Sequence, residues 1–227
     1  RGSAAGVVRQ LEKIMPRYTW LPVSLVLLTN LLSFYGSALL NLHRTHYNLT
    51  TALDAHIPLT PFFVLFYVLA YVQWVAGFCL IARESRAVCY RLIAGEILAK
   101  LCCMVIFLIL PTAMERPEIT GGGVWNALLR LVYLLDRPVT LFPSIHCLES
   151  WFCFRGALYL KKPPRWYPWL SLVMTLLVCA STVLVKQHLA VDIPSALLVA
   201  ELGLWLSRRL DAGRALRALN RRLRLDE

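Results

Sequence analysis

Acidic residues are scarce in this chain of 227 residues, which has 13 Asp and Glu against 24 Lys and Arg and a formal net charge of +11. The seven cysteines include no Cys-x-x-Cys pair, so neither a zinc site nor a disulfide framework is indicated. The basic residues lack interleaved aromatic side chains, which makes nucleic acid a poor explanation of the charge. No short apolar stretch precedes a small-residue cleavage site near Arg1, so we expect no signal peptide there.

Hydrophobic residues, in contrast, make up 58% of the chain, and the mean hydropathy is +0.60. Six apolar stretches each approach the roughly 20 residues that a helix needs to cross a bilayer. They cover 18–40, 60–82, 88–111, 144–160, 166–187 and 190–207. The sequence therefore predicts an all-α, polytopic membrane protein: a six-transmembrane-helix bundle that forms a single membrane domain over 1–227.

The basic residues are unevenly distributed between the two ends of these predicted spans. With the N-terminus in the cytoplasm, one side collects Arg1, Arg9, Lys13, Arg17, Arg83, Arg86, Arg91, Lys161, Lys162, Arg165 and the arginines between 208 and 224. The other side holds only Arg44, Arg116, Arg130, Arg137 and Lys186. The positive-inside rule then predicts cytoplasmic N- and C-termini and a basic cytoplasmic tail over 208–227, either a surface helix on anionic lipid or a frayed end.

Two histidines stand at the predicted outer ends of apolar segments. His146 follows Ser144 at the start of the fourth segment, and His188 precedes Asp192 by four residues at the start of the sixth. Ionisable residues at the ends of membrane helices are costly to place there, so a functional reading is the default. A His–Asp pair at this spacing shares one helical face, and the carboxylate can hold the imidazole in one tautomer.

The residues around these histidines suit phosphate chemistry. A helix that begins after Ser144 offers free backbone N–H groups and a positive dipole end to an anion. Arg116, in the long outer loop 112–141, is a planar cation that matches phosphate oxygens. The set predicts a phosphoryl-transfer site without a metal or a cofactor, at which one imidazole attacks phosphorus and the other protonates the leaving oxygen.

These motifs resemble those of the type 2 phosphatidic acid phosphatase superfamily of membrane lipid phosphatases. Its second motif, Pro-Ser-Gly-His, is matched at 143–146, and its first motif ends in Arg-Pro, matched at 116–117. Its third motif is Ser-Arg, five residues, His, three residues and Asp, and Ser181, His188 and Asp192 match that spacing. The resemblance covers about 60–207, the predicted catalytic core.

The resemblance implies roles for individual residues. His188 is expected to be the nucleophile that forms a phosphohistidine, Asp192 to orient it, and His146 to be the general acid. The phosphate oxygens are expected to be held by Arg116, Ser144 and Ser181. These roles describe an integral membrane lipid-phosphate phosphohydrolase at the extracytoplasmic leaflet of a plasma membrane or endomembrane, with a lipid phosphate as its substrate.

Two family cations are missing, at Ile109 and Thr182, and this leaves an alternative open. Lys186 lies one helical turn beyond Thr182 and restores one phosphate-binding charge if the helix continues. Similar losses occur in the sphingomyelin and inositol-phosphorylceramide synthase branch, which resembles this chain at Lys186-Gln187-His188 and moves a headgroup onto a lipid hydroxyl. A transporter or scaffold is disfavoured, because the sequence shows neither internal repeats nor interrupted spans.

Other polar residues are more simply explained by structural roles than by functional ones. Glu96 and Lys100 are one helical turn apart, and with Arg155 and Glu201 they are more consistent with a structural ion network than with a proton path. Glu149, one turn beyond His146, is positioned to tune that imidazole. The first outer loop, about 41–59, contains three histidines and Asp54 without a convincing set of metal ligands, and apolar residues at 124–135 predict a helix at the membrane interface.

Overall fold

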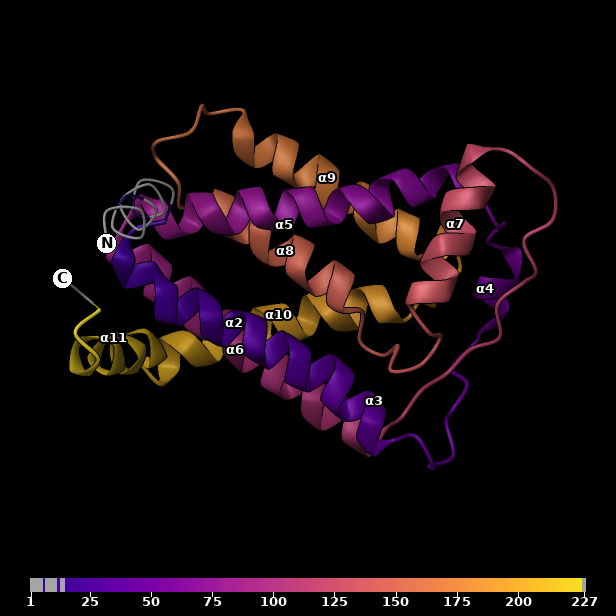
Figure 1. Cartoon of the computed structure of the whole chain (residues 1–227), viewed down its shortest axis with the longest axis horizontal. Helices are drawn as coiled ribbons and strands as arrows, with labels where there is room; N and C mark the ends of the chain where they lie inside the picture. Colours follow the sequence, from indigo (N-terminus) through magenta and orange to yellow (C-terminus); the bar gives the residue numbers. More distant parts are fainter. Residues whose placement is uncertain (1–5, 7–11, 13–14, 226–227) are drawn as a thin grey trace.

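The computed structural model describes Gly6, Glu12 and residues 15–225, and this part of the chain is helical (Figure 1). The α-helices are α2 (Trp20–Leu31), α3 (Ser37–Leu40), α4 (Ala52–His56), α5 (Val64–Glu84), α6 (Arg86–Ile109), α7 (Val124–Leu135), α8 (Ile145–Ala157), α9 (Tyr167–Leu184), α10 (Asp192–Arg209) and α11 (Ala212–Arg222). Short helical turns η1 (Arg17–Thr19) and η3 (Pro61–Phe63) precede α2 and α5, and a π-helical turn η2 (Leu32–Gly36) joins α2 to α3. The all-α prediction is confirmed.

Four helical segments of the described chain are long and apolar enough to cross a membrane. They are Arg17–Leu40, Pro61–Glu84, Arg86–Ile109 and Tyr167–Leu184. Each coincides within a few residues with a predicted apolar stretch, because a long, predominantly hydrophobic sequence is a local property that a helix inherits directly. The structure therefore supports a membrane-embedded protein.

The other two predicted spans have a different character. Helix α8 has only 13 residues, so at about 1.5 Å per residue it is roughly 20 Å long and shorter than a bilayer core of about 30 Å. Most of its residues are buried by neighbouring helices. Helix α10 has 18 residues but carries acidic residues at Asp192 and Glu201 and ends on two arginines. By length and composition, four helical segments of the described chain could span a membrane.

The helices form two groups that share α10 (Figure 1). Helix α6 packs against α2, α10 and α11, while α5, α8 and α9 pack against one another. Helix α10 also contacts α8 and so joins the two groups. Gly95 and Gly203 permit the close approach of α6 and α10, since a Cβ added at Gly203 would lie 2.4 Å from the Gly95 carbonyl oxygen.

A buried ion triad links α6 to α8. The Lys100 ammonium lies 2.8 Å from Glu96 and 2.5 Å from Glu149, and the lysine and Glu96 side chains are fully buried. Removing one member of a buried ion pair typically costs about 3–5 kcal/mol, because the remaining charge loses its partner. The predicted Glu96–Lys100 pair is therefore confirmed, and Glu149 completes the triad. Arg155 and Glu201, 3.0 Å apart, form a second ion pair whose partners the sequence did not specify.

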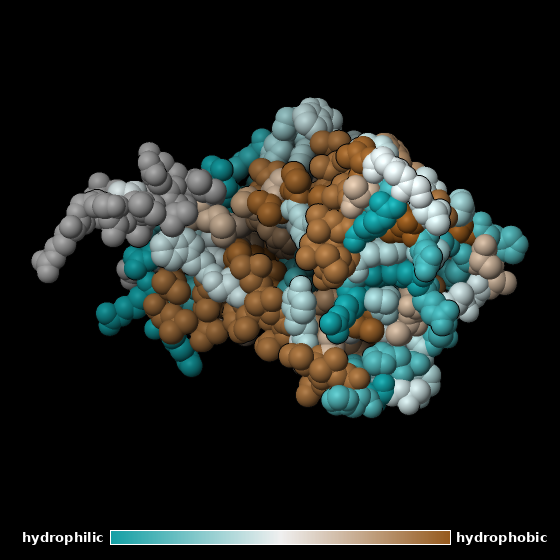
Figure 2. All heavy atoms as spheres, turned by 45° about the vertical axis from the view of Figure 1, so that its right-hand side comes forward, coloured by the Kyte–Doolittle hydropathy of each residue, from teal (hydrophilic) through white to brown (hydrophobic). Residues whose placement is uncertain are grey.

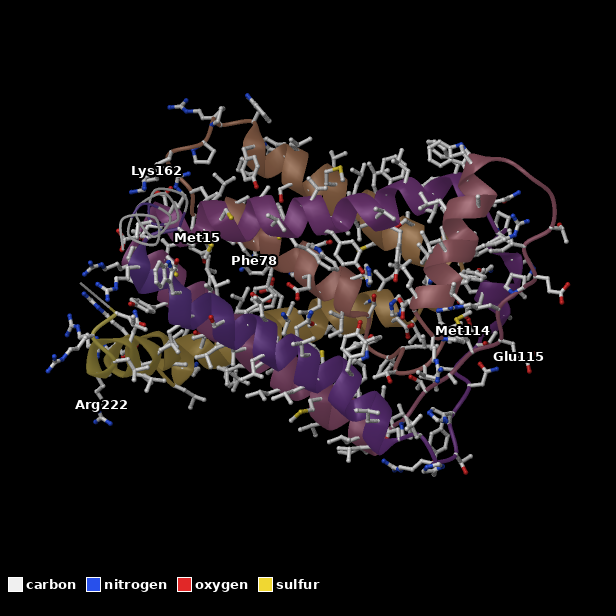
Figure 3. The ribbon with its side chains drawn as sticks, viewed as in Figure 1. Met15, Phe78, Met114, Glu115, Lys162 and Arg222 are labelled. Atoms are coloured by element: carbon white, nitrogen blue, oxygen red, sulfur yellow. The ribbon has the colours of Figure 1, made fainter. Side chains whose placement is uncertain are left out.

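The two ends of the molecule differ in the residues and chain segments that they carry. Hydrophobic side chains cover the helical body, and hydrophilic ones gather at the end that carries the long loops (Figure 2). Met114 and Glu115 lie at this loop end, whereas Lys162 and Arg222 lie at the opposite end, where the described chain begins and finishes (Figure 3). The predicted helix over 124–135 is confirmed as α7, which lies at the loop end and begins after Gly123 with a positive φ of 100°.

Candidate functional site

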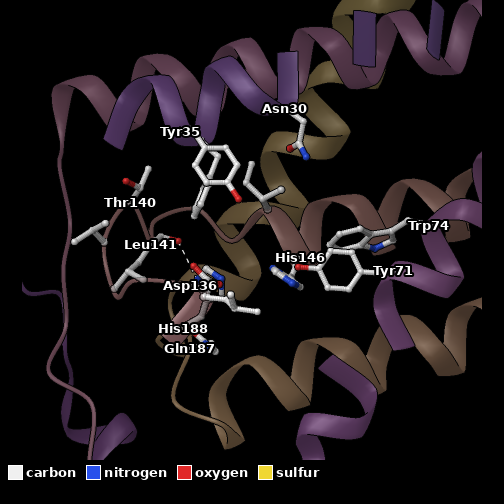
Figure 4. A pocket seen from close by; sticks show the side chains of 14 residues that line it. Asn30, Tyr35, Tyr71, Trp74, Asp136, Thr140, Leu141, His146, Gln187 and His188 are labelled. Carbon is white, nitrogen blue, oxygen red and sulfur yellow. Dashed lines mark hydrogen bonds between the residues drawn. The ribbon is translucent and has the colours of Figure 1, made fainter. Parts of the chain in front are cut away.

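A cavity of about 430 Å³ lies between α2–η2 on one side and α5 on the other, and both histidines line it. Its walls are mostly aromatic and aliphatic, and its polar lining includes Asn30, Asp136, Thr140 and Gln187 (Figure 4). The π-helical turn η2 contributes Phe34 and Tyr35 to the wall. Such single π-turns inside helices are frequent at functional sites, because the extra residue turns side chains away from the regular helical face.

His188 occupies the turn between α9 and α10, and its ring is fixed by two acceptors. Its Nδ1 lies 3.1 Å from Oδ2 of Asp192 and 3.1 Å from the carbonyl oxygen of Leu141. Since both partners accept, Nδ1 carries the proton and Nε2 carries the lone pair in the neutral ring. The predicted His188–Asp192 contact is therefore present, and the available nitrogen of His188 is Nε2.

The Leu141 carbonyl is itself positioned by the outer loops. Thr112 accepts hydrogen bonds at its hydroxyl from the backbone N–H groups of Leu141 and Phe142, at 3.0 and 3.1 Å. Isolated β-bridges pair Tyr47 with Thr112 and Ala113 with Val139. Segments from two loops at this end of the molecule therefore hold one of the two acceptors of the His188 ring.

The protonation of His188 depends on Asp192. Burial alone would lower the pKa of the His188 imidazole, but the hydrogen bond to Asp192 and the negative charge of that carboxylate outweigh burial and raise the pKa above its ordinary value of 6.5. Asp192 is oriented in turn by the backbone N–H of Leu189, which donates to Oδ2 at 2.9 Å. The carboxylate therefore both fixes the ring and stabilises its cationic form.

His146 faces His188 from the first turn of α8. The two ring centroids are 6.2 Å apart, and the rings are 9% and 8% exposed, respectively. Tyr67 stacks on the His146 ring at 4.1 Å, and its hydroxyl lies 3.5 Å from Nδ1 of His146 and donates to Asp136 at 2.9 Å. Nε2 of His146 is buried and has no hydrogen-bond partner among the described residues.

Arg116 lies at the edge of this arrangement. Its guanidinium stacks over the Tyr133 ring at 4.7 Å and donates to the backbone carbonyl of Asp136 at 2.5 Å and to the side-chain oxygen of Gln187. Asp136 and Gln187 line the cavity, whereas Arg116 contacts these two residues and does not line the cavity itself. Its Nε has no partner within the described chain.

The structure does not bring the other three predicted phosphate ligands to the cavity wall. The Ser144 hydroxyl caps α8 by accepting from the backbone N–H of Cys147 at 3.3 Å. The Ser181 hydroxyl donates to the Val178 carbonyl at 2.7 Å within α9. Helix α9 ends at Leu184, and Lys186 adopts a left-handed conformation with a φ of 53°, so its side chain does not continue the helical face that contains Thr182.

Lys186 instead helps to clamp the first outer loop onto the turn that carries His188. Its ammonium donates to the carbonyl oxygens of Asp54 and Ile57 at 3.0 and 2.5 Å. In return, the Asp54 carboxylate accepts from the backbone N–H of Ala190 at 2.7 Å. The bonds in both directions fix the turn on either side of His188.

Several residues that contact His146 or line the cavity were not predicted as site residues. Tyr67, Tyr71 and Trp74 surround His146, but in the sequence they are three aromatic residues within an apolar span. In the sequence, Asp136 is marked only by its place in the Asp-Arg-Pro stretch at 136–138. The available signal was that Tyr67, Tyr71 and Trp74 share one helical face at spacings of four and three residues.

The sequence suggested that Glu149 lies beside His146. In the structure its side chain points into the buried triad and contacts Lys100 instead. Among the residues that the structure describes, no three His, Cys, Asp or Glu side chains are grouped so that they could hold a metal ion. The seven cysteines are all unpaired.

Comparison of the chain with models of protein families, with curated proteins and with solved structures finds no match.

Proposed function

We propose that this protein is a membrane lipid-phosphate phosphohydrolase, related in mechanism to the type 2 phosphatidic acid phosphatase superfamily. The observation that carries the proposal is the pair of histidines across one cavity, with the Nδ1 of His188 held by Asp192. Reacting atoms approach to about 3–3.5 Å before bond formation. The two ring centroids are 6.2 Å apart, so one phosphate bound between the rings can contact both of them.

The proposed reaction has two steps. Nε2 of His188 attacks phosphorus, the P–O bond to the lipid breaks, and His146 gives its Nε2 proton to the leaving lipid oxygen. Neutral His146 then takes a proton from water, whose oxygen attacks phosphorus as the P–N bond breaks, which releases phosphate and restores both rings. The Asp136 carboxylate accepts from the Tyr67 hydroxyl, whose oxygen lies 3.5 Å from Nδ1 of His146, and this pair orients the His146 ring toward the cavity.

The phosphate in this proposal is held by backbone groups at the α8 N-terminus and by Arg116. Ile145 and His146 line the cavity at the first turn of α8, where free N–H groups and the helix dipole favour an anion. The Arg116 guanidinium reaches the phosphate by exchanging its contact with Gln187. Ser144 acts as the helix cap, Ser181 bonds to Val178 within α9, and Lys186 fixes the loop over 54–57 against the turn that carries His188.

In the proposed topology all six predicted spans lie within the bilayer, including the two that correspond to the short α8 and the charged α10. The loop end with the histidines faces the extracytoplasmic side, and the end with the basic residues and the chain ends faces the cytoplasm. The uneven distribution of arginines and lysines supports this orientation.

A second candidate function is transfer of a phosphate-linked headgroup to a lipid hydroxyl. It is favoured by the cavity wall, in which Tyr35, Tyr71 and Trp74 lie together with the Asp136 carboxylate (Figure 4). Aromatic faces and a carboxylate attract a cationic ammonium headgroup, whereas a phosphomonoester gains nothing from them. The acceptor hydroxyl then replaces water in the second step.

Product identification separates these two functions. Purified protein in bilayer nanodiscs is expected to release inorganic phosphate from phosphatidic acid, with the lipid alcohol detected by mass spectrometry, and the rate is expected to be unchanged in EDTA. A new phospholipid formed from phosphatidylcholine only when diacylglycerol or ceramide is added establishes the transferase instead. Loss of turnover in EDTA with recovery on adding a divalent ion contradicts the metal-free mechanism.

The pH profile tests the role of Asp192. Because His188 attacks as the neutral ring and Asp192 raises its pKa, kcat/KM of the native protein is expected to fall as pH decreases through a value above 6.5. In Asp192→Asn the charge is lost, burial lowers the pKa, and the acid limb moves to lower pH. The rate is expected to fall about a hundredfold or more as the ring loses its orienting carboxylate.

The matched control is Glu118→Gln, which removes an exposed carboxylate from the same loop end without a contact to His188. Its pH profile is expected to coincide with that of the native protein. An acid limb that stays in place in Asp192→Asn would show that the titrating group is not His188.

A further inference from the structure

A second cavity, of about 500 Å³, lies at the end of the molecule opposite the histidines. It is formed where the first turns of α6 meet the end of α10 and the start of α11. Four arginines line it, at positions 91, 208, 214 and 217, and Asp211 is the single acidic residue in its wall. The cavity therefore has a positive potential and suits an anionic ligand.

One of these arginines is fixed by packing, and another is paired with an acidic residue at the surface. Arg91 stacks over the Tyr159 ring at 4.5 Å, and its carbonyl oxygen accepts from the Ser207 hydroxyl at 2.9 Å, which fixes α6 to α10 at this level. Arg214 lies 3.0 Å from Asp211, at the left-handed turn between α10 and α11. Arg91 is therefore fixed beside the cavity, whereas Arg208 and Arg214 are exposed there and accessible to an anionic ligand.

Helix α11 is tied firmly to the bundle. Its Leu216 is buried in a cluster with Tyr90 and Ile93, and its Asn220 amide donates to the Tyr18 carbonyl and the Tyr90 hydroxyl at 2.9 and 2.6 Å. Gly213 allows the close approach, since a Cβ added there would lie 3.2 Å from backbone atoms of Arg91. The basic tail is therefore a packed helix over Ala212–Arg222, and the frayed-end alternative is wrong for this segment.

Exposed apolar side chains place the cavity at the membrane surface. Trp205 and Leu210 are exposed near the end of α10, and Leu219 and Leu223 are exposed on and just after α11. An amphipathic helix with this composition lies with its apolar side chains in the acyl boundary and its arginines at the level of the headgroups. A phosphate at that depth belongs to a lipid of the adjacent leaflet.

We propose that this cavity binds the phosphate of an anionic membrane lipid, such as phosphatidylglycerol, at a site separate from the histidine cavity. Guanidinium groups bind phosphate oxygens through paired, charge-assisted hydrogen bonds, and basic pockets between membrane helices bind anionic headgroups in this way. The bound lipid joins α6, α10 and α11 and stabilises their packing. This site does not depend on the proposed enzymatic function.

The test compares two double variants that remove the same charge. Arg208→Gln/Arg214→Gln removes two cavity arginines, whereas Arg222→Gln/Arg224→Gln removes two exposed arginines of the same tail that do not line the cavity. Arg222 points away from the bundle (Figure 3). Binding of phosphatidylglycerol and phosphatidylcholine to the full-length protein is measured by native mass spectrometry from detergent.

The cavity variant is expected to bind phosphatidylglycerol about tenfold more weakly, while the control changes less than about twofold and phosphatidylcholine binds weakly to all three proteins. An equal loss in both double variants would show diffuse attraction to the tail and overturn the site. Displacement of the lipid by soluble glycerol phosphate at an equal concentration would show a site for free phosphate and overturn the lipid assignment. Circular dichroism confirms that each variant is folded.

Discussion

Replacing His188 with alanine is expected to abolish turnover, with a loss of at least about a thousandfold, because the substitution removes the proposed covalent nucleophile. The bundle is expected to stay folded, since the turn around His188 is held independently by Asp54 and Lys186. The measurement is steady-state phosphate release from phosphatidic acid, with circular dichroism and size-exclusion profiles recorded for each protein.

His188→Gln is a second variant that retains a polar side chain at this buried position and lacks an imidazole, so a fold defect in the alanine protein does not leave the role untested. His56→Ala is the matched control, because His56 is an exposed outer-loop histidine that contacts the carbonyl oxygen of Ala52 and does not line the cavity. The control is expected to retain full activity. Either His188 variant that keeps a tenth of the native rate rules out a nucleophilic role.

Loss of His146 is expected to depend strongly on the leaving group. A general acid contributes typically ~10²–10⁴-fold when the leaving oxygen is a poor leaving group such as a lipid alkoxide, and little when the leaving group is a low-pKa phenol. His146→Ala is therefore expected to lose about that factor on phosphatidic acid and to regain much of the rate of the first step, measured as the burst of phenol release, on an aryl phosphate with an activated phenol.

The intermediate provides an independent readout for this variant. His146→Ala is expected to accumulate phosphohistidine on His188 with the aryl substrate, detectable by mass spectrometry after rapid quenching, because the first step no longer needs the proton while water attack still needs a base. His188→Ala serves as the comparison and should form no phosphohistidine with either substrate. Equal loss on both substrates without an intermediate would require exchanging the two histidine roles.

Some parts of the site follow from local sequence, and their outcome is visible in single residues. The spacing of His188 and Asp192 predicted a contact, and the structure has it at 3.1 Å. Ser144 stands just before α8 as its cap, as the position of a serine ahead of an apolar segment indicates. Such interactions join residues three or four apart, so the sequence contains both partners at a recognisable interval.

In other parts the structure differs from the expected helix length, because a helix ends sooner than its apolar sequence. Residues 144–160 are hydrophobic enough to suggest a span, but α8 stops at Ala157 and has 13 residues. Lys186 was expected on the face of Thr182, but α9 ends at Leu184 and the left-handed conformation of Lys186 carries its ammonium to Asp54. Hydropathy reports where a chain prefers lipid or protein interior, and it does not fix where a buried helix ends.

The sequence by itself determined the helical class, four apolar spans, the Glu96–Lys100 pair and the His188–Asp192 contact, because each depends on composition or on residues within one helical turn. Only the tertiary structure decided which distant groups meet. It placed His146 opposite His188 and gave Glu149 to Lys100. These outcomes depend on how helices pack across 40 or more residues of chain, and packing is selected by the fit of whole surfaces that no local pattern records.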